Sequence, residues 1–279
     1  MYLSLNNQLT TGRVKWPRFA ELASEVGFKG VDVMLGSAFA DGAEKTRSLL
    51  ERLRVRPAII DFPVEFRKDD QAFRDSLAKL EPAAQFAVAI GCPRMMTYIM
   101  PSSDTPKEEL RRTYKERFTE SANILARSHV RLGLEFLGPL HLRKMGKYEF
   151  IWHMPEMLAF AKECGPNVGL TLDAWHWHHA GATVQDILDA GKEHIVTVHF
   201  DDSPDLPPDQ IRDNQRLMPG EGVIDLNGFL QALKKIGYAD ALSVEVFGRG
   251  LKDMKPEDGA RLGLEKGRAA LKKAGVSEN

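Results

Sequence analysis

The sequence predicts a single closed (β/α)₈ barrel, the α/β architecture known as the TIM barrel, over residues 1–279. Eight short apolar runs alternate with eight amphipathic segments, which is the count of strands and helices that closes such a barrel. No Pro-, Gly- or Ser-rich linker divides the chain, so we expect one domain. A doubly wound sheet is the alternative, but it typically has fewer repeats and a glycine fingerprint that is missing here.

The predicted strands are Leu- and Val-rich runs without strict polar alternation, as expected of parallel strands that are covered on both faces. In chain order they cover residues 2–5, 30–35, 57–62, 94–99, 131–136, 168–173, 195–200 and 241–247. The active site of a barrel lies at the carboxyl ends of its strands, so residues at those ends are the first candidates for function.

The predicted helices have apolar residues at three- and four-residue spacing. They cover residues 16–26, 43–53, 71–90, 106–128, 154–164, 184–190, 227–236 and 256–274. Thr105-Pro106 and Asp225 or Asn227 are start signals, and glycines follow four of the predicted ends, at positions 91, 165, 237 and 275. The longest piece without periodicity, residues 201–225, follows the seventh strand, and we expect it to act as a lid or substrate clamp.

Strands five to eight share the pattern apolar, small, apolar, ionisable, apolar, with Glu135, Asp173, His199 and Glu245 as the ionisable residues. Because side chains alternate along a strand, the small residue two positions earlier points the same way and leaves room for neighbouring charges. Three carboxylates and one imidazole would repel one another and be poorly solvated unless a cation lay among them. Any one of them alone could be a hydrogen-bonded core residue, but the repeated register predicts a divalent metal site.

Composition excludes several classes of protein. The formal net charge is −1, from 38 basic and 39 acidic side chains, so there is no global basic field for nucleic acid or an anionic membrane. Cys92 and Cys164 lie far apart and suggest reduced structural thiols. The amino terminus lacks a signal-peptide pattern, and no stretch approaches the roughly 18 apolar residues of a membrane span. We therefore expect a soluble cytoplasmic protein; whether it forms a homo-oligomer is left open.

Five segments resemble the sugar isomerase/epimerase family of xylose-isomerase-like TIM barrels, with a pattern nearest to that of its inosose (2-keto-myo-inositol) isomerases. They are residues 133–136 (GLEF), 172–178 (LDAWHWH), 199–202 (HFDD), 216–222 (RLMPGEG) and 243–247 (SVEVF). The resemblance in order and spacing is strong over residues 131–255, whereas the amino-terminal half matches only as barrel architecture. Among relatives with this pattern the activity belongs to carbohydrate metabolism, and inositol catabolism is the implied context.

The resemblance implies that Glu135, Asp173, His199 and Glu245 bind one divalent ion such as Mn²⁺, Mg²⁺, Co²⁺ or Zn²⁺. It also implies that two further residues, His176 and Arg216, contact a small keto-polyol or keto-sugar substrate. Isomerisation or epimerisation removes a proton from the carbon next to a carbonyl and passes through a cis-enediolate. The candidates for the catalytic acid and base are Glu135 and Glu245. Alternatively, His176 belongs to a packing cluster of His and Trp, and Arg216 is a solvated loop residue.

The chain departs from the ketose 3-epimerase pattern at two places. Those enzymes carry a second Glu shortly after the first metal-binding Glu, where this chain has residues 137–141 (LGPLH). They also carry an Arg close behind the metal-binding His, where this chain has residues 201–205 (DDSPD). Both differences favour a cyclic polyol ketone or another unphosphorylated keto-sugar.

Other functions use the same fold. A dehydratase of inosose or dehydroshikimate type would use the same proton abstraction and then expel a β-hydroxyl. An apurinic endonuclease would need further metal ligands on strands two to four and a basic DNA groove. Those strand ends offer Met34, Asp61, Tyr98 and Met100, which argues against DNA repair. A non-catalytic carbohydrate-binding barrel is the remaining alternative.

Overall fold

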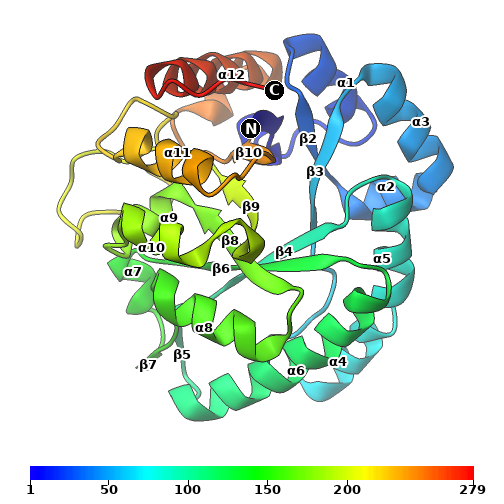
Figure 1. Cartoon of the computed structure of the whole chain (residues 1–279), viewed down its shortest axis with the longest axis vertical. Coiled ribbons are helices and arrows are strands. Elements are labelled where there is room, and N and C mark those ends of the chain that lie inside the picture. Colours follow the sequence, from blue (N-terminus) through cyan, green and yellow to red (C-terminus); the bar gives the residue numbers. More distant parts are fainter.

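The computed structural model describes residues 1–279 and contains a closed barrel of parallel strands surrounded by helices (Figure 1). The barrel strands are β1 (Tyr2–Leu5), β2 (Gly30–Val33), β3 (Arg56–Asp61), β4 (Arg94–Ile99), β6 (Arg131–Phe136), β8 (Val168–Asp173), β9 (Ile195–His199) and β10 (Ala241–Val244). Each strand lies within or largely overlaps one predicted run, so the predicted (β/α)₈ architecture is confirmed.

An outer ring of helices covers the barrel in Figure 1. The helices are α1 (Arg18–Val26), α2 (Leu35–Asp41), α3 (Ala43–Leu53), α4 (Asp70–Leu77), α5 (Leu80–Ala89), α6 (Lys107–Arg127), α7 (Leu140–Arg143), α8 (Met154–Cys164), α9 (Ala174–His179), α10 (Val184–Ala190), α11 (Leu226–Lys235) and α12 (Pro256–Lys273). Three short 3₁₀ helices, η1 (Asn7–Thr10), η2 (Lys192–His194) and η3 (Leu251–Asp253), complete the helical segments. None of the helices is both long enough and apolar enough to cross a lipid bilayer.

The structure differs from the predicted elements at several places. The strand predicted over 241–247 ends at Val244, and the short helices α7 and α9 were not predicted. The helix predicted over 71–90 is two helices, α4 and α5, because Pro82 has no backbone N–H to continue the first helix into the second. The strand predicted over 30–35 ends at Val33, and the following apolar residues begin α2 instead. Outside the barrel, β5 (Ser102–Ser103) and β7 (Tyr148–Glu149) form a small antiparallel pair that the sequence did not indicate.

Apolar faces hold the helices against the strands. On α6, Tyr114, Phe118 and Leu125 are buried at helical spacing, and Phe118 packs edge-on against Phe160 of α8 at a ring-centroid distance of 6.3 Å. The barrel strands themselves are almost entirely buried, as expected of a parallel sheet between helices and a filled interior. Both cysteines are free and buried, in agreement with structural thiols.

The first and last strands close the barrel. Strand β1 pairs in parallel with β10, with Leu5 opposite Val244. Helix α12 packs closely against this seam, since a Cβ at Gly267 would lie 2.9 Å from a methyl carbon of Leu3 on β1. The two chain ends therefore lie together, and the Asn279 N–H donates to the Met1 carbonyl at 2.9 Å (Figure 1).

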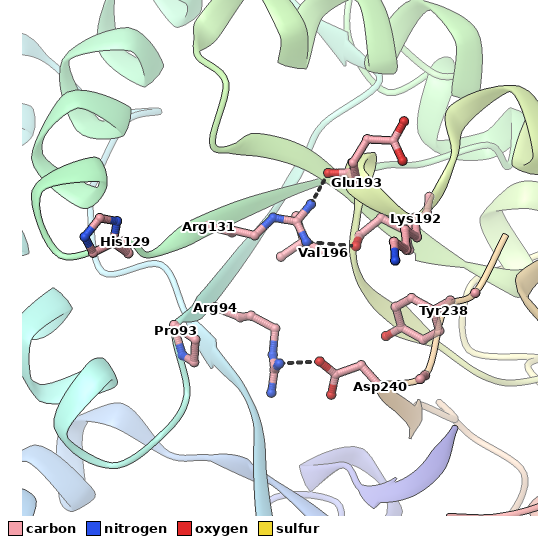
Figure 2. Close-up of a pocket in the computed structure, with 12 residues that line it drawn as sticks. Pro93, Arg94, His129, Arg131, Lys192, Glu193, Val196, Tyr238 and Asp240 are labelled. Atoms are coloured by element: carbon pink, nitrogen blue, oxygen red, sulfur yellow. Dashed lines mark hydrogen bonds and ion pairs between the residues drawn. The ribbon is translucent and has the colours of Figure 1, made fainter.

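Arginines at the starts of two strands close the amino-terminal end of the barrel (Figure 2). Arg94 forms an ion pair with Asp240 and donates to the Ala58 carbonyl at 2.9 Å. Arg131 donates to backbone carbonyls that precede and begin β9. They line a depression of about 440 Å³. Because these guanidinium groups are already bonded to the ends of neighbouring strands, we expect this end of the barrel to stabilise the fold and not to bind substrate.

Candidate active site and metal centre

Strands β6, β8, β9 and β10 bring Glu135, Asp173, His199 and Glu245 together at the carboxyl end of the barrel. One ligand atom of each lies within 4.8 Å of those of the other three. His199 Nδ1 lies 2.8 Å from Glu135 Oε1 and 3.2 Å from Glu245 Oε2. Its distance to Asp173 Oδ2 is 3.7 Å. Three of the four residues are buried, whereas Glu245 directly follows β10 and is partly exposed.

A layer of small residues lies directly beneath this cluster, as the sequence pattern predicts. Its members are Gly133, Thr171, Thr197 and Ser243, which are all buried. In the register of the sheet Thr171 lies opposite Thr197, and Ser243 lies opposite His199. A Cβ at Gly133 would lie only 2.4 Å from Thr171 Oγ1, so a larger side chain does not fit there. The small residues allow the strands to carry four bulky ionisable side chains at the next level.

The electrostatics of the cluster fit a divalent metal ion. Burial raises the pKa of Glu135 to about 7. Burial also opposes ionisation of Asp173, but Arg216 and the neighbouring histidines outweigh it and hold the pKa of Asp173 well below its usual range. The carboxylates around His199 overcome the effect of burial and raise its pKa well above the usual value. A positive charge is therefore favoured at this point, and carboxylate oxygens with one imidazole suit ions such as Mn²⁺ or Zn²⁺.

Arg216 reaches the cluster from the long loop after β9 and is only 1% exposed. Its Nη1 donates to Asp173 Oδ2 and Asp201 Oδ2, both at 2.7 Å, and to Glu245 Oε2 at 3.2 Å. Arg216 is thus a buried ion-pair partner of two predicted metal ligands and not a solvated loop residue. Its Nε has no hydrogen-bond partner within the protein. Contact with substrate stays a prediction.

Two aspartates outside the predicted set of site residues organise the loop that carries this arginine. Asp201 accepts from the Trp175 N–H at 2.9 Å in addition to the guanidinium. Asp202 accepts four backbone N–H groups at 2.8–3.0 Å, from Ser203, Gly220, Gly222 and Ile224. The sequence signals were their place just after β9 and their membership of the HFDD segment that carries the family resemblance. These bonds hold the loop in place over the barrel, so residues 201–225 form an ordered wall of the site.

His176 lies on α9, immediately after β8. The helix begins there because Asp173 is its N-cap, with Oδ1 accepting the His176 N–H at 2.9 Å. Burial lowers the pKa of His176 to about 4, so its imidazole is neutral. Its Nε2 lies 3.0 Å from Arg216 Nη2, while its Nδ1 has no partner within the protein. The structure therefore places both predicted substrate contacts beside the cluster, each with an unbonded nitrogen.

A cavity of about 130 Å³ opens beside His199 and Glu245. Its other walls come from the amino-terminal half of the barrel, where the sequence reading assigned no functional residues. They are Asn6, Asn7, Gln8, Asp32, Val33, Met34, Ile59, Asp61 and Met96. A small molecule in this cavity would contact the cluster on one side and polar side chains of β1 to β3 on the other.

Comparisons with known proteins agree with this architecture. The chain is 25% identical over 258 residues to an inosose isomerase of Bacillus velezensis, which covers 88% of this chain and 89% of that protein. A xylose isomerase domain protein from Alicyclobacillus acidocaldarius superposes with a TM-score of 0.90 at 28% identity over 99% of both chains. The IolI protein with a bound zinc atom superposes with a TM-score of 0.83 at 22% identity, over 98% of this chain and 99% of that one. The model of the xylose isomerase-like TIM barrel family matches residues 20–273, and the chain belongs to that family.

Proposed function

We propose that this protein is a divalent-metal-dependent isomerase or epimerase of a neutral keto-polyol or keto-sugar, with an inosose-type ring ketone as substrate. The observation that carries the proposal is the position of Glu245, which belongs to the cluster of four ionisable residues and also lines the cavity. The similarity to inosose isomerases supports this substrate class. We propose that the enzyme acts in the cytoplasm in inositol catabolism and uses Mn²⁺. We also propose that it binds neither nucleic acid nor membranes.

The reaction requires a base and a stabilised negative charge. A divalent ion held by Glu135, Asp173, His199 and Glu245 would supply positive charge toward the substrate oxygens as the α-proton leaves. Glu245 Oε2 is bonded to Arg216 and His199, whereas its Oε1 makes no hydrogen bond. We assign Oε1 as the acceptor of the α-proton and the carboxylate of Glu135 as the second proton carrier.

His176 and Arg216 complete the proposed site. The free Nδ1 of His176 and the free Nε of Arg216 are buried polar atoms, and such atoms cost stability unless something bonds to them. Neither residue lines the cavity beside Glu245, so a polyol oxygen would reach either nitrogen only after the side chains around the cluster move on binding. The two residues would orient the carbonyl and its neighbouring hydroxyl before proton transfer.

The test is a screen for exchange of the α-proton in deuterated water with Mn²⁺ or Co²⁺ present. The substrates are inososes, ketohexoses and 3-dehydroshikimate, and mass spectrometry measures deuterium on the α-carbon. An isomerase incorporates deuterium and returns a ketone of unchanged composition. A dehydratase, the second candidate, releases water and gives a product lighter by one water: an enol that tautomerises to a 1,2-dione from an inosose, or an aromatic catechol from 3-dehydroshikimate, with a changed ultraviolet absorption. A carbohydrate-binding barrel without activity would show neither signal after metal reconstitution.

Replacing Glu245 by Gln is the sharpest variant for this proposal. The amide keeps the size and one oxygen ligand but cannot take a proton, so turnover should fall by about 10² to 10⁴ while metal and substrate still bind weakly. Steady-state kinetics and α-deuterium exchange measure the loss. Glu116→Gln on the exposed face of α6 is the matched control and should retain full activity. Near-normal exchange in Glu245→Gln would mean that this residue is at most a ligand.

A further inference from the structure

The cavity wall opposite the metal cluster carries negative charge and no positive side chain. Asp32 on β2 and Asp61 at the end of β3 both line the cavity, and none of its lining residues is Lys or Arg. The remaining ionisable lining residues, His199 and Glu245, belong to the cluster on the other side. A substrate between the two walls would therefore meet carboxylates on the side that faces away from the cluster.

Asp32 is held rigidly by three hydrogen bonds. Its carboxylate accepts from Ser4 Oγ at 2.8 Å, Asn6 Nδ2 at 2.9 Å and Ser243 Oγ at 2.5 Å. Ser243 lies on β10, two positions before the cluster residue Glu245 that follows this strand, so these bonds link the two walls of the cavity. Because its lone pairs are largely used, Asp32 positions the Asn6 amide. Burial raises the pKa of Asp32 to about 6, so it adds negative charge to this wall at neutral pH and above.

Asp61 is in a different situation. It is the last residue of β3, is exposed, and makes no hydrogen bond or ion pair. Both of its oxygens are available to a molecule in the cavity, and a carboxylate accepts charge-assisted bonds from two neighbouring hydroxyls. The β3 register places Asp61 opposite Met96, whose side chain adds an apolar contact beside it.

We infer that Asp61 is a specificity-determining residue that accepts hydrogen bonds from the hydroxyls of an uncharged polyol and disfavours substrates that carry phosphate or carboxylate. Asp32 adds to the negative charge of the same wall. Like charges across a small cavity oppose binding of an anion, whereas vicinal hydroxyls gain two short bonds. This inference rests on the proposed function, because it concerns the substrate class of the same site.

The test compares Asp61→Asn with the parent protein by isothermal titration calorimetry in the presence of Mn²⁺. The probes are 2-keto-myo-inositol as the neutral polyol, and ribulose 5-phosphate and 3-dehydroshikimate as the anions. Asp61→Asn should weaken binding of the neutral probe about tenfold and should leave the anions unchanged or improve their binding. Asp75→Asn on the exposed face of α4 is the matched control, and it should leave the affinities for the neutral probe and for the anions unchanged.

The binding measurement tests the role of Asp61 independently of the proposed isomerase activity. It is wrong if the parent protein binds either anion as tightly as the neutral probe, if it binds no probe, or if Asp61→Asn leaves the preference unchanged. Melting curves of both variants show whether the fold is retained. If the neutral probe binds with the expected dependence on Asp61 but no α-deuterium exchange occurs, the proposed isomerisation fails while the assignment of Asp61 stands.

Discussion

At the scale of single residues, Asp173 has two structural tasks that use different oxygens. Oδ1 caps α9 through the His176 N–H, and Oδ2 faces the cluster and accepts from Arg216. The guanidinium charge is what keeps this buried carboxyl ionised, with its pKa well below the usual range. Asp173 is therefore a ready anionic ligand whose direction is set by the start of a helix.

Removing single ligands tests the metal assignment. Asp173→Asn and His199→Ala should each lower metal content and activity together, because both take one donor from the set of four. Elemental analysis measures the bound metal, and far-ultraviolet circular dichroism checks that the barrel remains folded. Asp75→Asn serves as the control with unchanged metal content. Full metal occupancy in both variants would remove the two residues from the ligand set.

At the scale of elements, the strands could be predicted better than the segments between them. The meeting of the four cluster residues was predictable because each lies at the same offset in an apolar run, and alternation along a strand then sets their common direction. Pro82 was a visible signal for the break between α4 and α5, but the apolar periodicity on both sides concealed it. The end of β2 was not predictable, since an apolar run does not reveal where a strand gives way to a helix.

The cavity wall formed by the amino-terminal half of the chain could not be predicted from the sequence, for a different reason. Asp32 and Asp61 become neighbours of Glu245 only when the barrel closes, and no local pattern encodes that approach. Asp201 and Asp202 also bond to distant partners: Trp175 on α9 lies 26 residues before Asp201, and Ile224 lies 22 residues after Asp202 at the far end of the loop. Long-range contacts of this kind depend on the whole topology.

The layer of small residues gives a prediction at this scale. Gly133→Ala should destabilise the barrel by about 1–3 kcal/mol, because the new methyl group has no room beside Thr171. Gly36→Ala is the matched control: it lies exposed in α2 with nothing near its Cβ position, so it should stabilise by about 0.5–1 kcal/mol. Urea unfolding measures both. Equal effects at the two glycines would show that the interior beneath the cluster has spare space.

At the scale of the whole molecule, metal binding and folding stability depend on each other through protons. In the metal-free protein the pKa values of Glu135 and His199 are both raised. A group whose pKa is higher in the folded than in the unfolded state stabilises the folded protein at low pH. This contribution to the free energy of unfolding is lost as the pH rises through the pKa of the folded state. A metal ion bound by the proposed ligands would have to displace these protons, so its affinity should rise with pH while the proton-linked stability falls.

The stabilisation by Mn²⁺ should therefore grow between about pH 6 and pH 8. With free Mn²⁺ at about a hundred times its dissociation constant at the upper pH, the added stability is about 2.7 kcal/mol. Differential scanning fluorimetry with Mn²⁺ or with a chelator measures the difference in melting temperature at each pH. Asp173→Asn should show little difference at any pH. A larger effect of Mn²⁺ at the lower pH would contradict the assignment of protons to the cluster.

The pairing of β1 with β10 also determines when the barrel can close during synthesis of the chain. On the ribosome β1 emerges first, and its partner strand follows about 240 residues later, which at roughly 5–20 residues per second is a delay of roughly 10–50 s. Throughout that time one edge of the growing sheet is open to other chains. Because Glu245 follows β10, the last residue of the four-residue cluster also arrives only then. Barrel closure and assembly of the cluster are consequently one late event in biosynthesis.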